Sequence, residues 1–166
     1  MLHTFVLEMQ KLLRSLDANL DKAAAYAAAK KFDPSVLLHS RLAPDQWPLI
    51  RQIQAACDSA KLGAARCAGQ DAPAHADTEQ TIDEAKKRIA TVVAYLDGFK
   101  ASDFDGVDKR TVTTPRWEGK SMTAPDYFVE HALPNFFFHL TTAYAILRHN
   151  GVDVGKRDYL GQLTMR

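Results

Sequence analysis

The stretch that decides the fold is TAPDYFVEHALPNFFFHLTTAYAILRHNG, residues 123–151. It predicts one long helix with an interior proline, Pro134. His131, Asn135 and His139 recur every four residues along it, and because each step of four advances only about 40° around the axis, all three lie on one stripe. Two imidazoles and an amide on one stripe indicate either a metal or substrate site or ordinary polar residues of a packed helix.

Three further long helices are predicted upstream of this stretch, because apolar residues recur there at spacings of three and four. They run over residues 2–29, 44–69 and 77–96, with a short helical turn at residues 35–39 between the first two. Glycine is the usual C-terminal stop of a helix, so Gly69 is expected to end the second one.

Two details of these helices bear on the site. Trp47 falls on the predicted buried face of the second helix, which begins at Pro44 and tolerates Pro48 in its first turn. Asp77, with Gln80 three residues later, resembles a capping box that would start the third helix.

Residues 97–124 differ in composition from the helical segments, because they are rich in glycine and β-branched residues. Two short extended segments, 109–114 and 117–122, are expected to pair across Pro115–Glu118 as a hairpin. A lone hairpin is marginal in water, so it should pack on the helices. The sequence therefore predicts an all-α fold, a four-helix bundle with a small β-hairpin between the third and fourth long helices, in a single domain over residues 1–166.

Composition and charge narrow the function classes. The chain has 166 residues, 46% hydrophobic and 25% charged, as a soluble globular protein does. Its net charge of +1, from 21 basic and 20 acidic residues, argues against a general nucleic-acid binder. No apolar run approaches the roughly 20 residues of a membrane span, and no signal peptide is recognised. We therefore expect a cytoplasmic protein with neither nucleic-acid nor membrane partners.

The two cysteines do not form a disulfide within their helix. Cys57 and Cys67 are ten residues apart, which is about 15 Å of helical rise. Free thiols fit a reducing compartment. Cys57 lies on the apolar stripe and is expected to be a buried, unreactive thiol rather than a nucleophile.

Three motifs carry a resemblance to a known family. They are RLAPDQWPLIRQIQ at residues 41–54, LPNFFFHLTTAYAILRHNGV at 133–152 and GKRDYLG at 155–161. With the order of the helices, they resemble the DinB/YfiT-like bundle superfamily, and more closely a bacterial branch known as a domain of unknown function. The likeness covers nearly the whole chain. It implies an up-down-down-up bundle that is often dimeric.

The resemblance also implies which positions would hold a metal ion, and these positions can be compared with the residues of this sequence. Many superfamily members hold nickel or zinc with three histidines, one from the second helix and two that lie four residues apart in the last. Leu147–Arg148 matches the Leu-Arg signature near the end of the last helix, which places one ligand at His139 and the other at Asn135. The predicted second helix has no histidine. Since an asparagine amide is a poor ligand for nickel or zinc beside imidazole, no metal and no other cofactor is expected.

The candidate pocket therefore centres on His139. His131 lies about 12 Å away along the axis, too far to share one ion with His139. Gln52, Gln54 and Asp58 are the polar residues of the second helix expected to approach the stripe, where one of them would replace the missing histidine. The candidate pocket residues are His139, Asn135, His131, Gln54 and Asp58.

Two functions stay open, and no catalytic residue is assigned. The first is a bundle protein without the three-histidine metal site that binds a small molecule near His139. The alternative is a transferase or isomerase that acts with a low-molecular-weight thiol and a divalent metal, nickel or zinc, held by His139 with residues such as Asp58. A homodimer is expected in addition, because Phe136–Phe138 cover most of the helix circumference and need cover from the hairpin or a second subunit.

Overall fold

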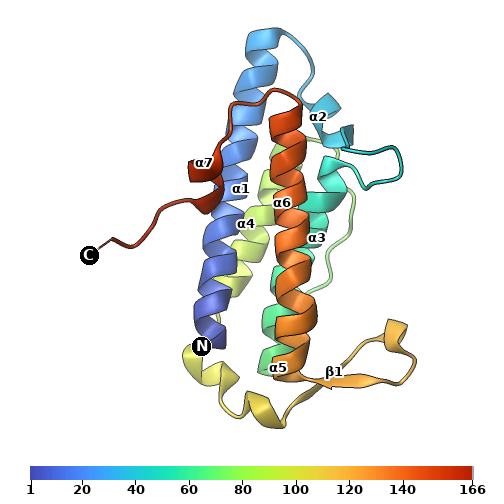
Figure 1. Cartoon of the computed structure of the whole chain (residues 1–166), viewed down its shortest axis with the longest axis vertical. Coiled ribbons are helices and arrows are strands. Elements are labelled where there is room, and N and C mark those ends of the chain that lie inside the picture. The colour runs from blue at the N-terminus through green and yellow to red at the C-terminus, as the bar shows by residue number, and fades with distance from the viewer. Residues whose placement is uncertain (166) are drawn as a thin grey trace.

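Four long helices form the bundle (Figure 1), and the computed structural model describes residues 1–165. They are α1 (Leu2–Lys30), α3 (Leu49–Ala68), α4 (Ile82–Asp97) and α6 (Leu133–His149). When α1 runs upward, α3 and α4 run downward and α6 runs upward, which confirms the predicted up-down-down-up order. Helix α3 packs on α6 and α4, and α1 packs on α4 and α6. Within residues 1–165, no helix is long and apolar enough to cross a membrane.

Short elements fill the connections between these helices. They are α2 (Ser35–His39), the 3-10 turns η1 (Ala101–Phe104), η2 (Val107–Lys109) and η3 (Pro115–Trp117), strands β1 (Thr111–Thr113) and β2 (Ser121–Thr123), α5 (Ala124–Asp126) and α7 (Lys156–Leu160). The sequence predicted α2 but missed α7. Helix α7 packs on α1, where the Lys22 ammonium lies 2.7 Å from the Asp158 carboxylate.

The core is built from the apolar stripes that the sequence marks. Tyr127, Phe128 and Phe136 are its largest fully buried side chains. Phe138 remains 57% exposed, so one member of the phenylalanine run is only partly covered by the described residues. Cys57 is fully buried, and burial raises its pKa to about 12, so the thiol is protonated and acts as a packing group.

The second long helix begins later than predicted. Helix α3 starts at Leu49 rather than Pro44, because Pro48 has an extended backbone with ψ 167° and a residue before proline avoids the helical region. Trp47 therefore lies outside the helix and is 48% exposed, so its assignment to the buried face was wrong. Gly69 ends the helix as predicted, with φ 70°.

The third long helix also begins later than predicted. Its cap is Thr81 rather than Asp77: the Thr81 hydroxyl accepts from the Glu84 N–H at 3.2 Å, and the Glu84 carboxylate accepts from the Thr81 N–H at 3.0 Å. Asp77 instead pairs with Arg51. The predicted capping box was wrong because an ion pair outside the helix engages this aspartate.

The hairpin is present but shorter than predicted. Strands β1 and β2 pair antiparallel, with Thr111 opposite Thr123 and Thr113 opposite Ser121. The connection runs from residue 114 to 120 and contains η3, so Trp117 lies in a loop rather than in a strand. Trp117 in this loop packs against Tyr127 and His131 at the start of the last helical run.

The last helical run is continuous from residue 124 to 149, but it is not uniform. A π-helical segment, η4 (Tyr127–Ala132), joins α5 to α6. It ends two residues before Pro134, whose missing N–H removes the α-helical partner of the Glu130 carbonyl. Within η4, Tyr127 and Ala132 face the core while His131 is exposed.

The Thr81 cap of α4 should contribute to the stability of the protein. Thr81→Ala removes the hydroxyl that accepts from Glu84, and we expect it to lower the free energy of unfolding by about 1 kcal/mol in urea titrations followed by circular dichroism. Thr78→Ala is the matched control, since Thr78 is exposed and its hydroxyl makes no hydrogen bond within the described residues. Equal stability of the two variants would contradict the capping role.

Candidate functional site

An open groove of about 530 Å³ runs between α3, the η4–α6 run and the hairpin loop. All five candidate residues from the sequence lie on its wall: His139, Asn135, His131, Gln54 and Asp58. The groove also has three further aromatic residues, Trp47, Trp117 and Tyr127. Geometry therefore brings together residues that are up to 85 positions apart in the candidate set, from Gln54 to His139.

The groove follows an antiparallel seam between α3 and the last helical run. Four pairs of residues meet in order along this seam: Gln52 with His139, Ser59 with Asn135, Gly63 with Ala132, and Arg66 with Tyr127. From the first pair to the last, α3 advances about 21 Å at 1.5 Å per residue. The groove is thus elongated, with a His139 end and a hairpin end.

At the first end, the position of the His139 proton follows from its neighbours. The Gln52 side-chain N–H donates to the Trp47 carbonyl at 3.0 Å, so the Gln52 carbonyl oxygen is the atom 2.8 Å from Nδ1 of His139. An oxygen there requires a proton on Nδ1, which leaves a lone pair on Nε2. Burial lowers the pKa of His139, so the ring is neutral at pH 7.

Trp47 covers the same imidazole. Its indole stacks on the His139 ring at 5.7 Å between centroids and 9° between planes. The Arg51 guanidinium lies 5.1 Å from the centroid of the same indole. Because α3 starts only at Leu49, Trp47 precedes the helix and can take this position. Pro44 and Pro48, on either side of Trp47, are the feature of the sequence that could have predicted this.

Asn135 and His131 occupy the middle of the groove. Asn135 donates from its amide to the Ser59 hydroxyl at 2.9 Å, so it joins α6 to α3 and does not cap the carbonyl freed by Pro134. His131 stacks on Tyr127 at 5.4 Å and meets Trp117 edge-on at 5.7 Å. Partial loss of solvent around the ring, followed by the charge of Arg66, lowers the pKa of His131, so this ring is also neutral at pH 7.

Gln54 and Asp58 line the groove but do not replace a ligand beside His139. Gln54 donates to Glu79 at 2.7 Å, and Asp58 lies 3.0 Å from Arg88 and 2.8 Å from Lys61. Gln52, the third residue considered on this helix, is the one that reaches the imidazole.

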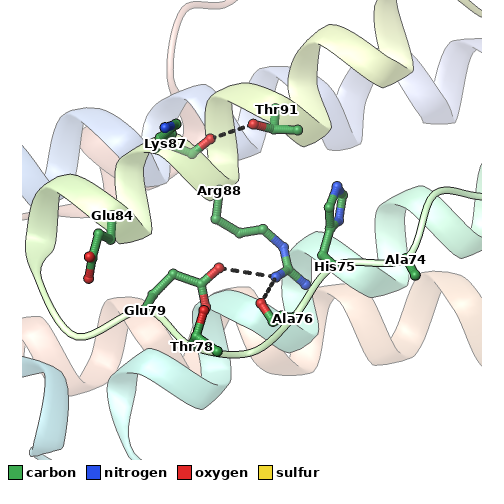
Figure 2. Close-up of a pocket in the computed structure, with 9 residues that line it drawn as sticks. All are labelled: Ala74, His75, Ala76, Thr78, Glu79, Glu84, Lys87, Arg88 and Thr91. Atoms are coloured by element: carbon green, nitrogen blue, oxygen red, sulfur yellow. Dashed lines mark hydrogen bonds and ion pairs between the residues drawn. The ribbon is translucent and has the colours of Figure 1, made fainter.

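A second hollow of about 330 Å³ lies under the connection between α3 and α4, and Arg88 lines it. Figure 2 shows Arg88 extending from α4 toward this connection, where Glu79 and the Ala76 carbonyl accept from one of its nitrogens, each at 3.1 Å. Arg88 is only 4% exposed. His75, in the same hollow, meets the Lys61 ammonium at 3.0 Å, and burial followed by the Lys61 charge lowers its pKa.

Comparison with known proteins now identifies the family. The model of a domain of unknown function, DUF1993, matches residues 1–160. The chain belongs to the DUF1993 family. It is also similar to the crystal structure of a DinB family member protein from Shewanella denitrificans, at 52% sequence identity and a TM-score of 0.93, over 97% of this chain and 92% of that one. A search of the curated proteins found no match.

The donor set of this DUF1993 protein does not fit the three-histidine metal site of the wider superfamily. Gln52 meets His139 from α3, and the Asn135 amide nitrogen faces Ser59. In residues 1–165, no three His, Cys, Asp or Glu side chains come together in an arrangement that could hold a metal ion. The site instead offers two neutral imidazoles, those of His139 and His131, within an aromatic groove.

Three histidines with lowered pKa values predict how stability depends on pH. His139, His131 and His75 all have a pKa lowered below 6.5, so as pH falls through 6.5 the unfolded chain binds protons that the folded chain does not. The free energy of unfolding should therefore be constant from pH 8 to 7 and fall between pH 6.5 and 5.5. Urea titrations at pH 7.5, 6.5 and 5.5 measure this, and His139→Gln should show a shallower fall. Equal stability at pH 7.5 and 5.5 would contradict the lowered pKa values.

Proposed function

We propose that this DUF1993 protein binds an elongated small molecule in the groove, with a hydrogen-bond donor of the ligand at Nε2 of His139. The observation that carries this proposal is the Gln52–His139 hydrogen bond, because it leaves the imidazole a single acceptor nitrogen. Nε2 makes no hydrogen bond to any residue in the described part of the chain, and the ring lines the groove.

The form of the groove supports a small-molecule ligand. Its volume of about 530 Å³ lies within the range of roughly 300–1,000 Å³ that is typical of ligand pockets. Such pockets combine aromatic walls with a few polar groups that fix the orientation of the ligand. Here Trp47 and Trp117 provide flat apolar surfaces at the two ends, His139 provides a polar group at the Trp47 end, and Asn135 provides one in the middle.

The chain contains its own reporter of binding. Its two tryptophans are Trp47 and Trp117, and both line the groove. A ligand that enters should therefore change the intrinsic fluorescence of the whole protein, and no tryptophan elsewhere adds background. Binding measured by fluorine NMR of a fluorinated probe can be compared directly with this signal.

The acceptor role of His139 predicts a preference between two probes of nearly equal shape. The 4-fluorophenol probe carries a donor, whereas 4-fluoroanisole carries a methyl group in its place. We expect wild-type protein to bind the phenol about five- to tenfold more tightly, the value of one hydrogen bond of about 1 kcal/mol, and His139→Leu to abolish the preference.

His149→Leu is the matched control, since His149 lies on the same helix but outside the groove lining. Circular dichroism checks that both variants are folded. Equal affinity of the wild-type protein for the two probes, or a preference that survives His139→Leu, would reject the acceptor role.

A further inference from the structure

The hairpin end of the groove holds two cations without carboxylate partners. Arg66, on α3, and Arg116, in the hairpin loop, both line the groove. Neither forms a salt bridge with any residue in the range 1–165, whereas Arg51 and Arg88 both do. Two unneutralised guanidinium groups at one end of a groove favour a negatively charged group there.

The acidic residues of the groove do not cancel this charge. Asp58 is bound by Lys61 and Arg88, and Asp77 by Arg51 and Arg88. Each carboxylate thus already has two cationic partners. The positive charge of Arg66 and Arg116 remains as a surplus over the ion pairs of the groove wall.

The aromatic residues fix one of these cations in place. Arg66 donates to the Tyr127 hydroxyl at 3.1 Å, and its guanidinium carbon lies 5.7 Å from the centroid of that ring. Trp117 packs edge-on against the same ring at 6.0 Å, which brings its neighbour Arg116 to the same end. Arg66 uses one nitrogen for Tyr127, so its other N–H groups are available to a ligand.

We infer that the hairpin end is a carboxylate subsite and that the ligand is an elongated, partly aromatic carboxylic acid. The carboxylate binds between Arg66 and Arg116, and an aromatic ring packs beside Trp117 and His131. This inference rests on the proposed function, because it describes the second end of the ligand whose first end faces His139. Guanidinium groups match carboxylates through paired N–H donors, and neutral rings suit the aromatic body.

A matched pair of probes tests the subsite in the full-length chain. Fluorine NMR titrations compare 4-fluorobenzoate with 4-fluorobenzamide, which has a similar shape but no charge. We expect wild-type protein to bind the benzoate about tenfold more tightly, and this preference to weaken as NaCl is raised. Arg66→Gln and Arg116→Gln should each reduce it severalfold, and the double variant should abolish it.

The variants are chosen so that folding does not obscure the result. Arg116 is exposed, and glutamine at position 66 keeps a side-chain amide donor near Tyr127. Arg157→Gln, on α7, is the control for loss of an exposed arginine outside the groove and should leave the preference unchanged. Equal affinity for the two probes, or a preference that survives the double variant, would overturn the subsite.

The two proposals fail separately. If the phenol preference at His139 persists while benzoate and benzamide bind equally, the carboxylate subsite is rejected and the groove remains a ligand site. If benzoate is preferred through Arg66 and Arg116 but phenol and anisole bind equally, the subsite stands and the His139 contact is rejected. Absence of binding by every probe up to millimolar concentration rejects both.

Discussion

Close approach of α3 to the last helical run is the constraint on which the site depends. A Cβ placed on Gly63 would lie only 3.1 Å from the Cβ of Ala132, so even an alanine at position 63 would require its neighbour to shift by a few tenths of an ångström. Because the backbones come this close, Ser59 reaches Asn135, and Gln52 reaches His139 one to two turns further along. The contact between Gly63 and Ala132 therefore permits the Gln52–His139 hydrogen bond that fixes the proton on Nδ1 of His139.

Buried cations hold the acidic residues of the groove wall, Asp58 and Asp77, in place. Arg88 and Lys61 are almost fully buried, and buried cations are stable only when carboxylates and carbonyls surround them. Asp58 bridges the two, and Asp77 and Glu79 reach Arg88 from the connection before α4. These requirements engage the acidic residues of the wall, which leaves Arg66 and Arg116 at the hairpin end without a carboxylate partner among residues 1–165.

The sequence predicted the bundle well because helical burial repeats over every three or four residues and is encoded locally. His131, Asn135 and His139 line one groove for the same reason, since they share one stripe of the helix. Prediction from the sequence failed where two local signals competed, as at Trp47, where Pro44 and Pro48 each can begin a helix. The spacing of residues along α3 also could not show whether Gln52 or Gln54 meets the imidazole. The two side chains leave the helix on nearly opposite sides, and only the packing of α3 against α6 decides which of them faces His139.

The stripe formed by His131, Asn135 and His139 can favour different ligands, depending on the side chains that surround it. A histidine that binds a metal donates one N–H to a nearby oxygen and presents the other nitrogen, and Gln52 gives His139 this arrangement. A metal site also needs further donors that converge on the ion, whereas Asn135 turns its amide to Ser59 and the free charges in the groove are those of arginines. Surplus positive charge disfavours a divalent cation and favours an anion. A single acceptor nitrogen at one end and guanidinium groups at the other are therefore better suited to an organic acid with a hydrogen-bond donor than to a metal ion.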